Sequence, residues 1–320
     1  MVTEYDFKKN GVYGGLNMKK IYKSITIAAL AMSMVLSLPA AGLTAKADAI
    51  TDAAPEDVYV SFGADLSDEE KAKVMNLLGI TESDLENYTV GEITNADEHK
   101  YLGDYLDASV IGTRALSSVA VVIGQDGEGI DVETKNISYC TPGMYTNALI
   151  TAGIKDADVI VAGPFEITGT AALVGAMRAY SALTGEDISS TSMDTAVNEL
   201  VVTSEIAKEG NISAEDVEQL MAFVKAKVVE ENLDNEEAIS KAIDMGAEEL
   251  GISVTQEEKD SIISLMKKIN DLDLDLDSMK EQAKDLFNKL EDMGIDKEQA
   301  KGFFQRIVEA LTEFFKNLFN

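Results

Sequence analysis

Few side chains in this sequence could form a catalytic or metal-binding centre. The 320-residue chain has one histidine, His99, and one cysteine, Cys140. A zinc site built from several His and Cys ligands therefore cannot be assembled. A Ser-His-Asp triad needs a defined geometry, and the residues around Ser117 and Ser118 do not form the Gly-x-Ser-x-Gly turn that presents a nucleophilic serine. The sequence predicts no catalytic residue and no cofactor.

An alternating acidic run is the best candidate for a metal site. Its four aspartates alternate with leucines and are Asp271, Asp273, Asp275 and Asp277. An EF-hand loop that began at the first of these would need Gly at its sixth position and Glu at its twelfth, where this chain has Leu276 and Gln282. We interpret the run as an extended connector whose last aspartate caps a helix, with a surface calcium site as the alternative.

The glycine-rich stretch 124–129 favours a turn over a phosphate-binding loop. No Lys-Ser or Lys-Thr pair follows it, and the next segment, 130–139, has the pattern of a strand and not of a helix. The preceding segment, 115–123, is also apolar and strand-like. We therefore expect the two segments to pair as a β-hairpin.

Residues 141–185 carry the most regular pattern in the chain. Pro142 suits the first turn of a helix. The apolar run 158–162 is typical of a strand that is buried on both faces, and residues 163–164, Gly-Pro, are expected to end it. The pattern predicts a helix, a buried strand and a second helix in succession.

The second helix of this stretch should begin with a threonine cap. Thr168 or Thr170 can supply it, and small residues at 171–179 would let the helix lie close to the strand that it crosses. Cys140 ends the apolar segment 137–140, so we expect a buried thiol. As the single cysteine, it cannot form an intramolecular disulfide.

The rest of the chain divides into a mixed part and a helical part. Ser67 and Glu70 form a capping box for a helix that Gly79 ends. The other elements expected before residue 115 are strands at 58–62 and 89–93 and a helix at 97–106. The helices expected after residue 190 are 193–208, 214–231, 236–250, 256–269, 278–292 and 297–319.

These patterns predict an α+β protein. A mixed-sheet α/β domain over residues 56–186 is followed by an all-helical domain over residues 190–320, with a polar linker near Ser189. The sequence predicts this division because glycines thin out and helix-capping signals recur after residue 190.

The N-terminal segment 1–47 has the organisation of a secretory signal peptide. A basic stretch after Met18 precedes an apolar region at 24–38, and residues 45–47, Ala-Lys-Ala, fit the small-x-small cleavage pattern. The alternative is an anchor that stays attached, but the apolar run is short for a membrane span. We expect a start at Met18, cleavage after Ala47 and a secreted protein without a stable transmembrane anchor.

The charge excludes some partners. Residues 48–320 hold 21 basic and 55 acidic residues, a net charge of −34. A surface this acidic repels nucleic acid and anionic lipid. We interpret the charge as a solubilising surface, with attraction of divalent cations or basic partners as the alternative. Tryptophan is absent, so the most common flat platform for binding sugars is missing.

The last predicted helix has the largest apolar stripe. The aromatic and leucine side chains chosen as possible partner or membrane contacts are Phe303, Phe304, Leu311, Phe314 and Phe315. Membrane-surface helices usually have a clearly basic polar face, whereas this one is nearly neutral. We expect the stripe to pack on the preceding helices, with docking to a membrane or a partner as the alternative.

Several segments together resemble one protein family. They are SFGADLS (61–67), YLGDYL (101–106), SSVAVVI (117–123), the block 141–180 and DLDLDLDSMKEQAKDL (271–286). The chain is similar to the YpuA-like exported proteins of Gram-positive bacteria, which form domain-of-unknown-function family 1002. The resemblance implies an exported protein and supplies no catalytic residues.

Two functions remain open from the sequence. The first is a non-enzymatic binding or interaction protein of the cell envelope. The alternative is a secreted envelope hydrolase that uses acidic residues. A pocket with two carboxylates, one with a raised pKa, would favour the hydrolase. A broad exposed apolar patch without such a pocket would favour the interaction protein.

The signal-peptide interpretation predicts the start of the mature protein. Expression of the whole chain in a Gram-positive host should give secreted material that begins near Asp48, because peptidase cleavage follows residues 45–47. Intact-mass measurement of the secreted protein checks this. A mass that still includes residues 24–38 would contradict it.

Overall fold

The computed structural model describes residues 50, 53–125, 127–209, 212–272 and 274. Several expectations fall outside these residues. They are the signal peptide at 1–47, the helices at 278–292 and 297–319 with Phe303, Phe304, Leu311, Phe314 and Phe315, and the aspartates 273, 275 and 277.

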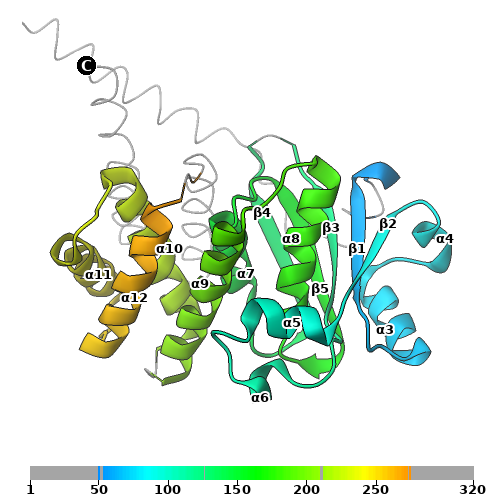
Figure 1. Cartoon of the computed structure of the whole chain (residues 1–320), viewed down its shortest axis with the longest axis horizontal. Coiled ribbons are helices and arrows are strands. Elements are labelled where there is room, and N and C mark those ends of the chain that lie inside the picture. The colour runs from blue at the N-terminus through cyan, green and yellow to red at the C-terminus, as the bar shows by residue number, and fades with distance from the viewer. Residues whose placement is uncertain (1–49, 51–52, 126, 210–211, 273, 275–320) are drawn as a thin grey trace, which may run out of the picture. The chain divides into compact units, whose positions relative to one another are not determined.

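A five-stranded mixed sheet confirms the α+β class (Figure 1). The strands are β1 (Val58–Gly63), β2 (Thr89–Ile93), β3 (Ser118–Ile123), β4 (Ile130–Ile137) and β5 (Ala157–Ile167). Their order is β2-β1-β3-β5-β4. β2 is parallel to β1 and β4 is parallel to β5, whereas β3 is antiparallel to both of its neighbours. Four strands therefore run in one direction and β3 in the other.

The hairpin prediction for β3 and β4 is wrong, because β5 lies between them. Val119 is paired with Val161, and Val132 is paired with Val159 on the other side of β5. β3 and residues 159–164 of β5 are buried and largely apolar, which suits strands inside the sheet, whereas β4 alternates and its Asp131 is exposed. An edge position suits such a strand.

The stretch 124–129 connects the sheet differently from a hairpin turn. The amides of Gly127 and Gly129 donate to Oδ1 of Asp156, at 3.0 and 2.8 Å. Asp156 directly precedes β5. The loop is therefore held at the start of β5 while the chain passes to the far edge of the sheet.

The helix–strand–helix pattern of residues 141–185 is confirmed. It forms α7 (Pro142–Thr151), β5 and α8 (Thr170–Thr184). The expected end of the strand at residues 163–164 is wrong, because β5 continues to Ile167 and pairs there with Ile137. A bulge at Asn136, with φ at 60°, lets β4 follow this extension. The side-chain amide of Asn136 donates to the carbonyl of Gly163 at 3.0 Å.

Neither Thr168 nor Thr170 caps α8. The N-cap is Gly169, with φ at 95° and no side-chain hydrogen bond. A Cβ at this position would lie 2.6 Å from the Tyr145 hydroxyl and 2.7 Å from Ile137. Close packing and left-handed backbone both require glycine here, and they take precedence over a hydroxyl cap.

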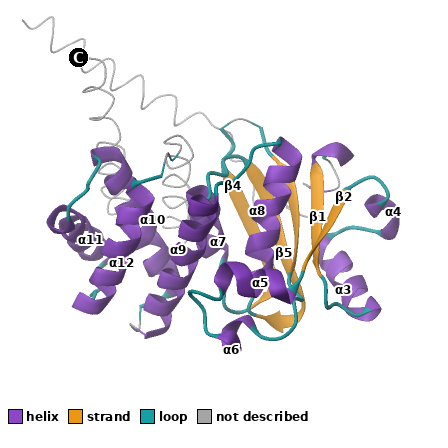
Figure 2. Cartoon of the chain, viewed as in Figure 1, coloured by secondary structure: helices purple, strands orange, loops and turns teal. Residues whose placement is uncertain are grey.

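Helices cover both faces of the sheet (Figure 2). On one face α8 packs on β1 and β3 and α7 packs on β4, around side chains such as Val119 and Val161. On the other face, α3 (Asp68–Leu78) covers Val60, Ala120 and Ile160. The alternation of these side chains along each strand follows from the two-residue period of β structure.

Four short elements complete this described part of the chain, one before β1 and three between strands. They are η1 (Pro55–Asp57), α4 (Glu82–Leu85), α5 (Asn95–Leu102) and α6 (Ala108–Ile111). The helix expected at 97–106 is wrong at its C-terminal end, because α5 stops before Gly103. Asp107 accepts a hydrogen bond from the amide of Ser109 at 2.7 Å and starts α6 separately. The strand expected from residue 115 begins at Ser118.

Within residues 190–272 the structure describes four helices after the sheet, close to the positions predicted. They are α9 (Ser190–Glu209), α10 (Ala214–Glu231), α11 (Glu236–Leu250) and α12 (Gln256–Asn270). Their apolar faces form a second core, while α9 also packs on α7. The division into two domains at residues 186–190 stays a prediction.

A buried ion pair joins α7 to α9 and α10. Lys225 on α10 and Glu199 on α9 have side chains with no exposed surface. Nζ of Lys225 lies 2.9 Å from Oε1 of Glu199 and donates to Oε2 at 3.2 Å. It also donates to the Asn147 carbonyl and the Thr151 hydroxyl of α7, at 2.9 and 3.1 Å. Each of the three helices therefore depends on the same charged group.

Removal of one partner of this pair should be costly. We expect Lys225→Met to lower the free energy of unfolding by about 3–5 kcal/mol, because Glu199 would be left buried without a cation. Glu199→Gln combined with Lys225→Met should recover most of the loss. Chemical denaturation checks both. The control is Lys241→Met, at a solvent-exposed pair with Glu237, where we expect little change in stability. Equal effects of Lys225→Met and the control would contradict the assignment.

Candidate functional site

Polar side chains gather along the side of the sheet that is formed by the ends of the strands, the strand edge. β1, β2, β4 and β5 all end at this edge, and β3 begins there. In open α/β sheets, ligands commonly bind beyond the carboxyl ends of the strands. α5 follows β2 at this edge and packs beside the lower end of α8 (Figure 1). A functional site is therefore expected at this edge.

Glu98 is the most deeply buried carboxyl at this edge. It lies on α5, and only 2% of the residue is exposed. The Thr170 hydroxyl donates to Oε1 of Glu98 at 2.9 Å, and the side-chain amide of Asn95 donates to Oε2 at 3.4 Å. Burial raises the pKa of Glu98, and these hydrogen bonds only partly offset the effect.

Cys140 and Tyr145 lie on the inner side of the same edge. The Tyr145 hydroxyl donates to the carbonyl of Gly169 at 2.5 Å. Burial raises the pKa of the Cys140 thiol to about 12. The expectation of a buried thiol is confirmed, and a thiol with this pKa stays protonated at neutral pH and is a poor nucleophile.

The two serines considered as nucleophiles have structural partners. The Ser118 hydroxyl accepts from the amide of Gly63 at 3.1 Å, and the Ser117 hydroxyl accepts from the amide of Ala172 at 3.1 Å. Both serines are buried. They satisfy backbone donors where β1 and α8 meet β3, while His99 is exposed on α5.

An ion pair links α5 to α8. Arg178 on α8 donates to Oδ1 of Asp97 at 2.5 Å, and its guanidinium lies 5.7 Å from the centre of the Tyr101 ring. The Arg178 hydrogen bond holds the pKa of Asp97 well below its usual value. The polar groups described at this edge of the sheet therefore have internal partners and structural roles.

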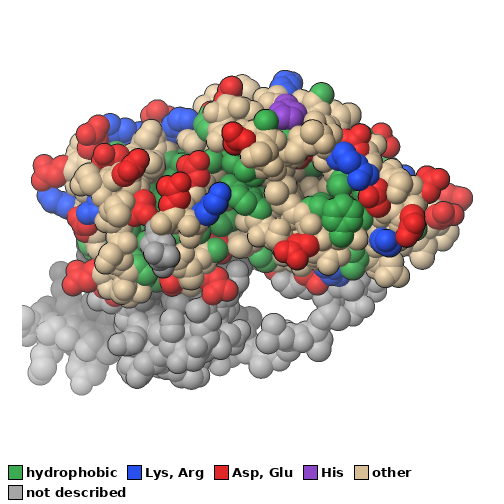
Figure 3. Space-filling view, turned by 90° about the horizontal axis from the view of Figure 1, so that it is seen from below, with side chains coloured by type: hydrophobic (Ala, Val, Ile, Leu, Met, Phe, Trp, Pro, Cys, Tyr) green, Lys and Arg blue, Asp and Glu red, His purple; other side chains and the backbone are tan. Residues whose placement is uncertain are grey.

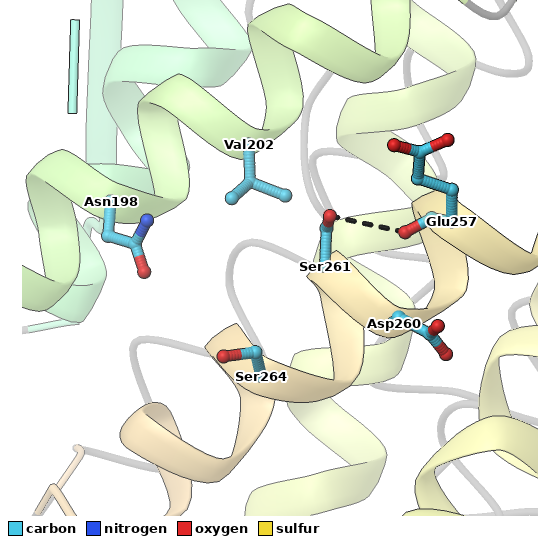
Figure 4. Close-up of a pocket in the computed structure, with 6 residues that line it drawn as sticks. All are labelled: Asn198, Val202, Glu257, Asp260, Ser261 and Ser264. Atoms are coloured by element: carbon cyan, nitrogen blue, oxygen red, sulfur yellow. Dashed lines mark hydrogen bonds between the residues drawn. The ribbon is translucent and has the colours of Figure 1, made fainter.

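An accessible hollow lies between α9 and α12 (Figure 4). Its volume is about 540 Å³, and the residues that line it are Asn198, Val202, Glu257, Asp260, Ser261 and Ser264. Asn198 and Val202 of α9 face Ser261 and Ser264 of α12, whereas the two carboxylates extend from α12 away from α9. The Ser261 hydroxyl donates to the carbonyl of Glu257 at 3.2 Å.

The lysines around this hollow are already engaged. Lys259 pairs with Asp244, and Lys267 pairs with Glu236 at 2.7 Å. Lys268 donates to Asn198 at 3.2 Å. The hollow therefore has neutral hydrogen-bonding walls and exposed carboxylates at its mouth. Figure 3 shows Asp and Glu side chains spread over another face, as the composition implies.

The structure describes only part of the acidic run 271–277. Asp271 is the C-cap of α12, and the other three aspartates of the run lie outside the described residues. Among the residues that the structure describes, no group of three or more His, Cys, Asp or Glu side chains could hold a metal ion. The surface calcium site stays a prediction.

Comparison with known proteins shows the family to which this chain belongs. A family model described as "Protein of unknown function (DUF1002)" matches residues 62–286. The chain belongs to the DUF1002 family. It is 37% identical over 307 residues to "Uncharacterized protein YpuA" of Bacillus subtilis (strain 168), which covers 95% of this chain and 98% of that protein. No solved structure matches this chain.

The DUF1002 match includes both regions described above, the strand edge and the hollow. Along the described part of this DUF1002 chain, no helix has the length and apolarity needed to cross a membrane. Glu98, Lys225 and the hollow were all missed by sequence reasoning. Glu98 stands in a charged segment, and only the contact with Thr170, 72 positions away, distinguishes it from a solvated glutamate.

The ion pair of Asp97 predicts a pH-dependent stability. Its pKa is lower in the folded state than its unfolded value of about 3.9, so its contribution is complete above that pH and is lost as pH falls. Asp97→Asn should cost about 1 kcal/mol at neutral pH, since both side chains are partly exposed to screening solvent. The cost should shrink below about pH 4 in denaturation curves. Arg178→Met should show the same trend, and a constant cost in both variants would contradict this account.

Proposed function

We propose that this DUF1002 protein is an exported binding protein of the cell envelope that acts without catalysis. Its signal peptide, residues 1–47, would be removed, and residues 190–320 would form an all-helical part that carries the binding surface. The signal-peptide pattern supports export, and the resemblance to YpuA-like proteins is consistent with it.

The observation that carries the proposal is the contrast between the two regions. The groups with altered acidity or nucleophilic potential, such as Glu98 and Cys140, are buried among internal partners. The hollow between α9 and α12 can instead be reached from solvent and presents hydroxyl, amide and carboxylate groups. Such a surface is suited to recognition more than to bond cleavage.

The hollow favours a basic partner. Val202 provides an apolar floor for the stem of an arginine or lysine side chain, and Ser261 and Ser264 provide hydrogen-bond acceptors. Glu257 and Asp260 lie exposed at its mouth. In a chain with a net charge of −34 over residues 48–320, the surrounding field would also attract a cation.

The hydrolase alternative finds less support in the described residues. A glycosidase-type site needs two carboxylates that flank one accessible bond. Glu98 has the raised pKa of a general acid but is only 2% exposed, whereas Glu257 and Asp260 are on the open surface. The structure does not bring these two properties together in one pair.

Binding of a basic peptide tests the proposal. Residues 48–320 would be titrated with a peptide of about twelve alternating arginines and glycines, at about 20 mM salt to limit screening. We expect Glu257→Gln combined with Asp260→Asn to weaken binding about tenfold by calorimetry, because the mouth of the hollow loses both charges. Ser264→Leu should also weaken binding, because it fills the hollow and changes no charge.

The matched control removes two exposed carboxylates elsewhere. Glu56→Gln with Asp57→Asn makes the same change in net charge on η1. We expect it to leave most of the affinity intact. Equal weakening by the two double variants, or no effect of Ser264→Leu, would show attraction to the general charge and refute the hollow as the binding surface.

A further inference from the structure

The carboxyl of Glu98 is buried without a cation. Within the described residues it forms no ion pair, and Arg178 on the neighbouring α8 is bound to Asp97 instead. Its two hydrogen bonds come from the neutral groups of Thr170 and Asn95. An ionised carboxylate in this place would lose hydration without gaining an opposite charge.

The groups around α5 do not change this balance. The charged and titratable ones are Asp65 from the β1–α3 loop, His99 on α5, Cys140 before α7, Tyr145 on α7, the Asp97–Arg178 pair toward α8, and Asp194 and Lys268 near Tyr105. α6 contributes no titratable side chain. Burial is the largest effect on Glu98, Asp65 acts in the same direction, and His99 opposes both.

The same carboxyl holds a separate segment of chain in place. Residues 94–112 comprise α5, α6 and their connection. Glu98 attaches this segment to the first turn of α8 through Thr170. Asn95, its other partner, also donates to the carbonyl of Gly112 at 3.3 Å, so the two ends of the segment are tied together at this point.

We propose that residues 94–112 form a pH-sensitive cover over the strand edge, closed while Glu98 is a neutral acid and loosened when it ionises. Cys140 and Tyr145 lie close enough to Glu98 to interact with it electrostatically, and both are buried in the closed form. The inference is independent of the hollow between α9 and α12, because it uses other elements of the fold.

The direction of the pH effect follows from linkage. Burial raises the pKa of Glu98 in the closed form, so the closed form binds the proton more tightly than the open one. The advantage of the closed form is complete below the unfolded value of about 4.3 and is lost as pH rises through the raised value.

Cys140 makes the opening measurable, because it is the single cysteine in the chain. The rate of its alkylation by iodoacetamide would be compared between the parent and Glu98→Gln, pH by pH. The intrinsic pH dependence of the thiol cancels in this ratio. We expect the ratio of parent to variant to rise by up to about tenfold per pH unit and then level off. Glu92→Gln, at an exposed glutamate on β2, should give a ratio that does not change with pH.

Hydrogen exchange distinguishes opening of the cover from unfolding of the whole protein. In the parent, amides of residues 94–112 should lose protection as pH rises, after correction for intrinsic exchange, while those of residues 157–162 in β5 keep it. Thr170→Val should increase Cys140 alkylation at low pH as well, because the neutral acid loses its partner. A flat alkylation ratio, or equal loss of protection in both segments, would overturn the proposal.

Discussion

Strand β5 has hydrogen-bonded neighbours on both edges and side chains buried on both faces, and the arrangement of the other elements follows from these two demands. Its backbone groups are satisfied by β3 on one side and β4 on the other. Its apolar side chains need cover from α3 on one face and from α7 and α8 on the other. The chain therefore leaves β3 through a loop and returns as β4 on the far side of β5, instead of folding back as a hairpin.

Buried polar groups then determine how the helices join this sheet. Ser117 and Ser118 satisfy backbone amides at its edge, and Lys225 with Glu199 binds α7 to α9 and α10. A charged or polar group inside a protein is costly unless it is paired. These contacts are therefore demanding in geometry. Among the described residues Glu98 differs from Glu199 in this respect, since its hydrogen-bond partners are neutral and burial raises its pKa.

The separation of reactive chemistry from accessible surface bears on function. At the strand edge, the titratable groups are held by internal hydrogen bonds, Tyr145 to the Gly169 carbonyl, Glu98 to the Thr170 hydroxyl and Asp97 to Arg178. Between α9 and α12, polar groups are open to solvent and lie on a strongly acidic protein. Recognition of a basic partner requires only the second arrangement. The strand edge can then serve stability and its dependence on pH.

The sequence by itself determined the helices, their caps and the apolar strands, because these follow from local periodicity and from capping groups such as Ser67 with Glu70. It also determined the family and the acidic charge. Only the tertiary structure decided the strand order, the glycine cap of α8 at Gly169 and the roles of Glu98 and Lys225. Each of these depends on contacts between residues far apart in the chain. No local pattern in the sequence records which strands pair, how closely Tyr145 approaches Gly169, or which charged side chains become buried.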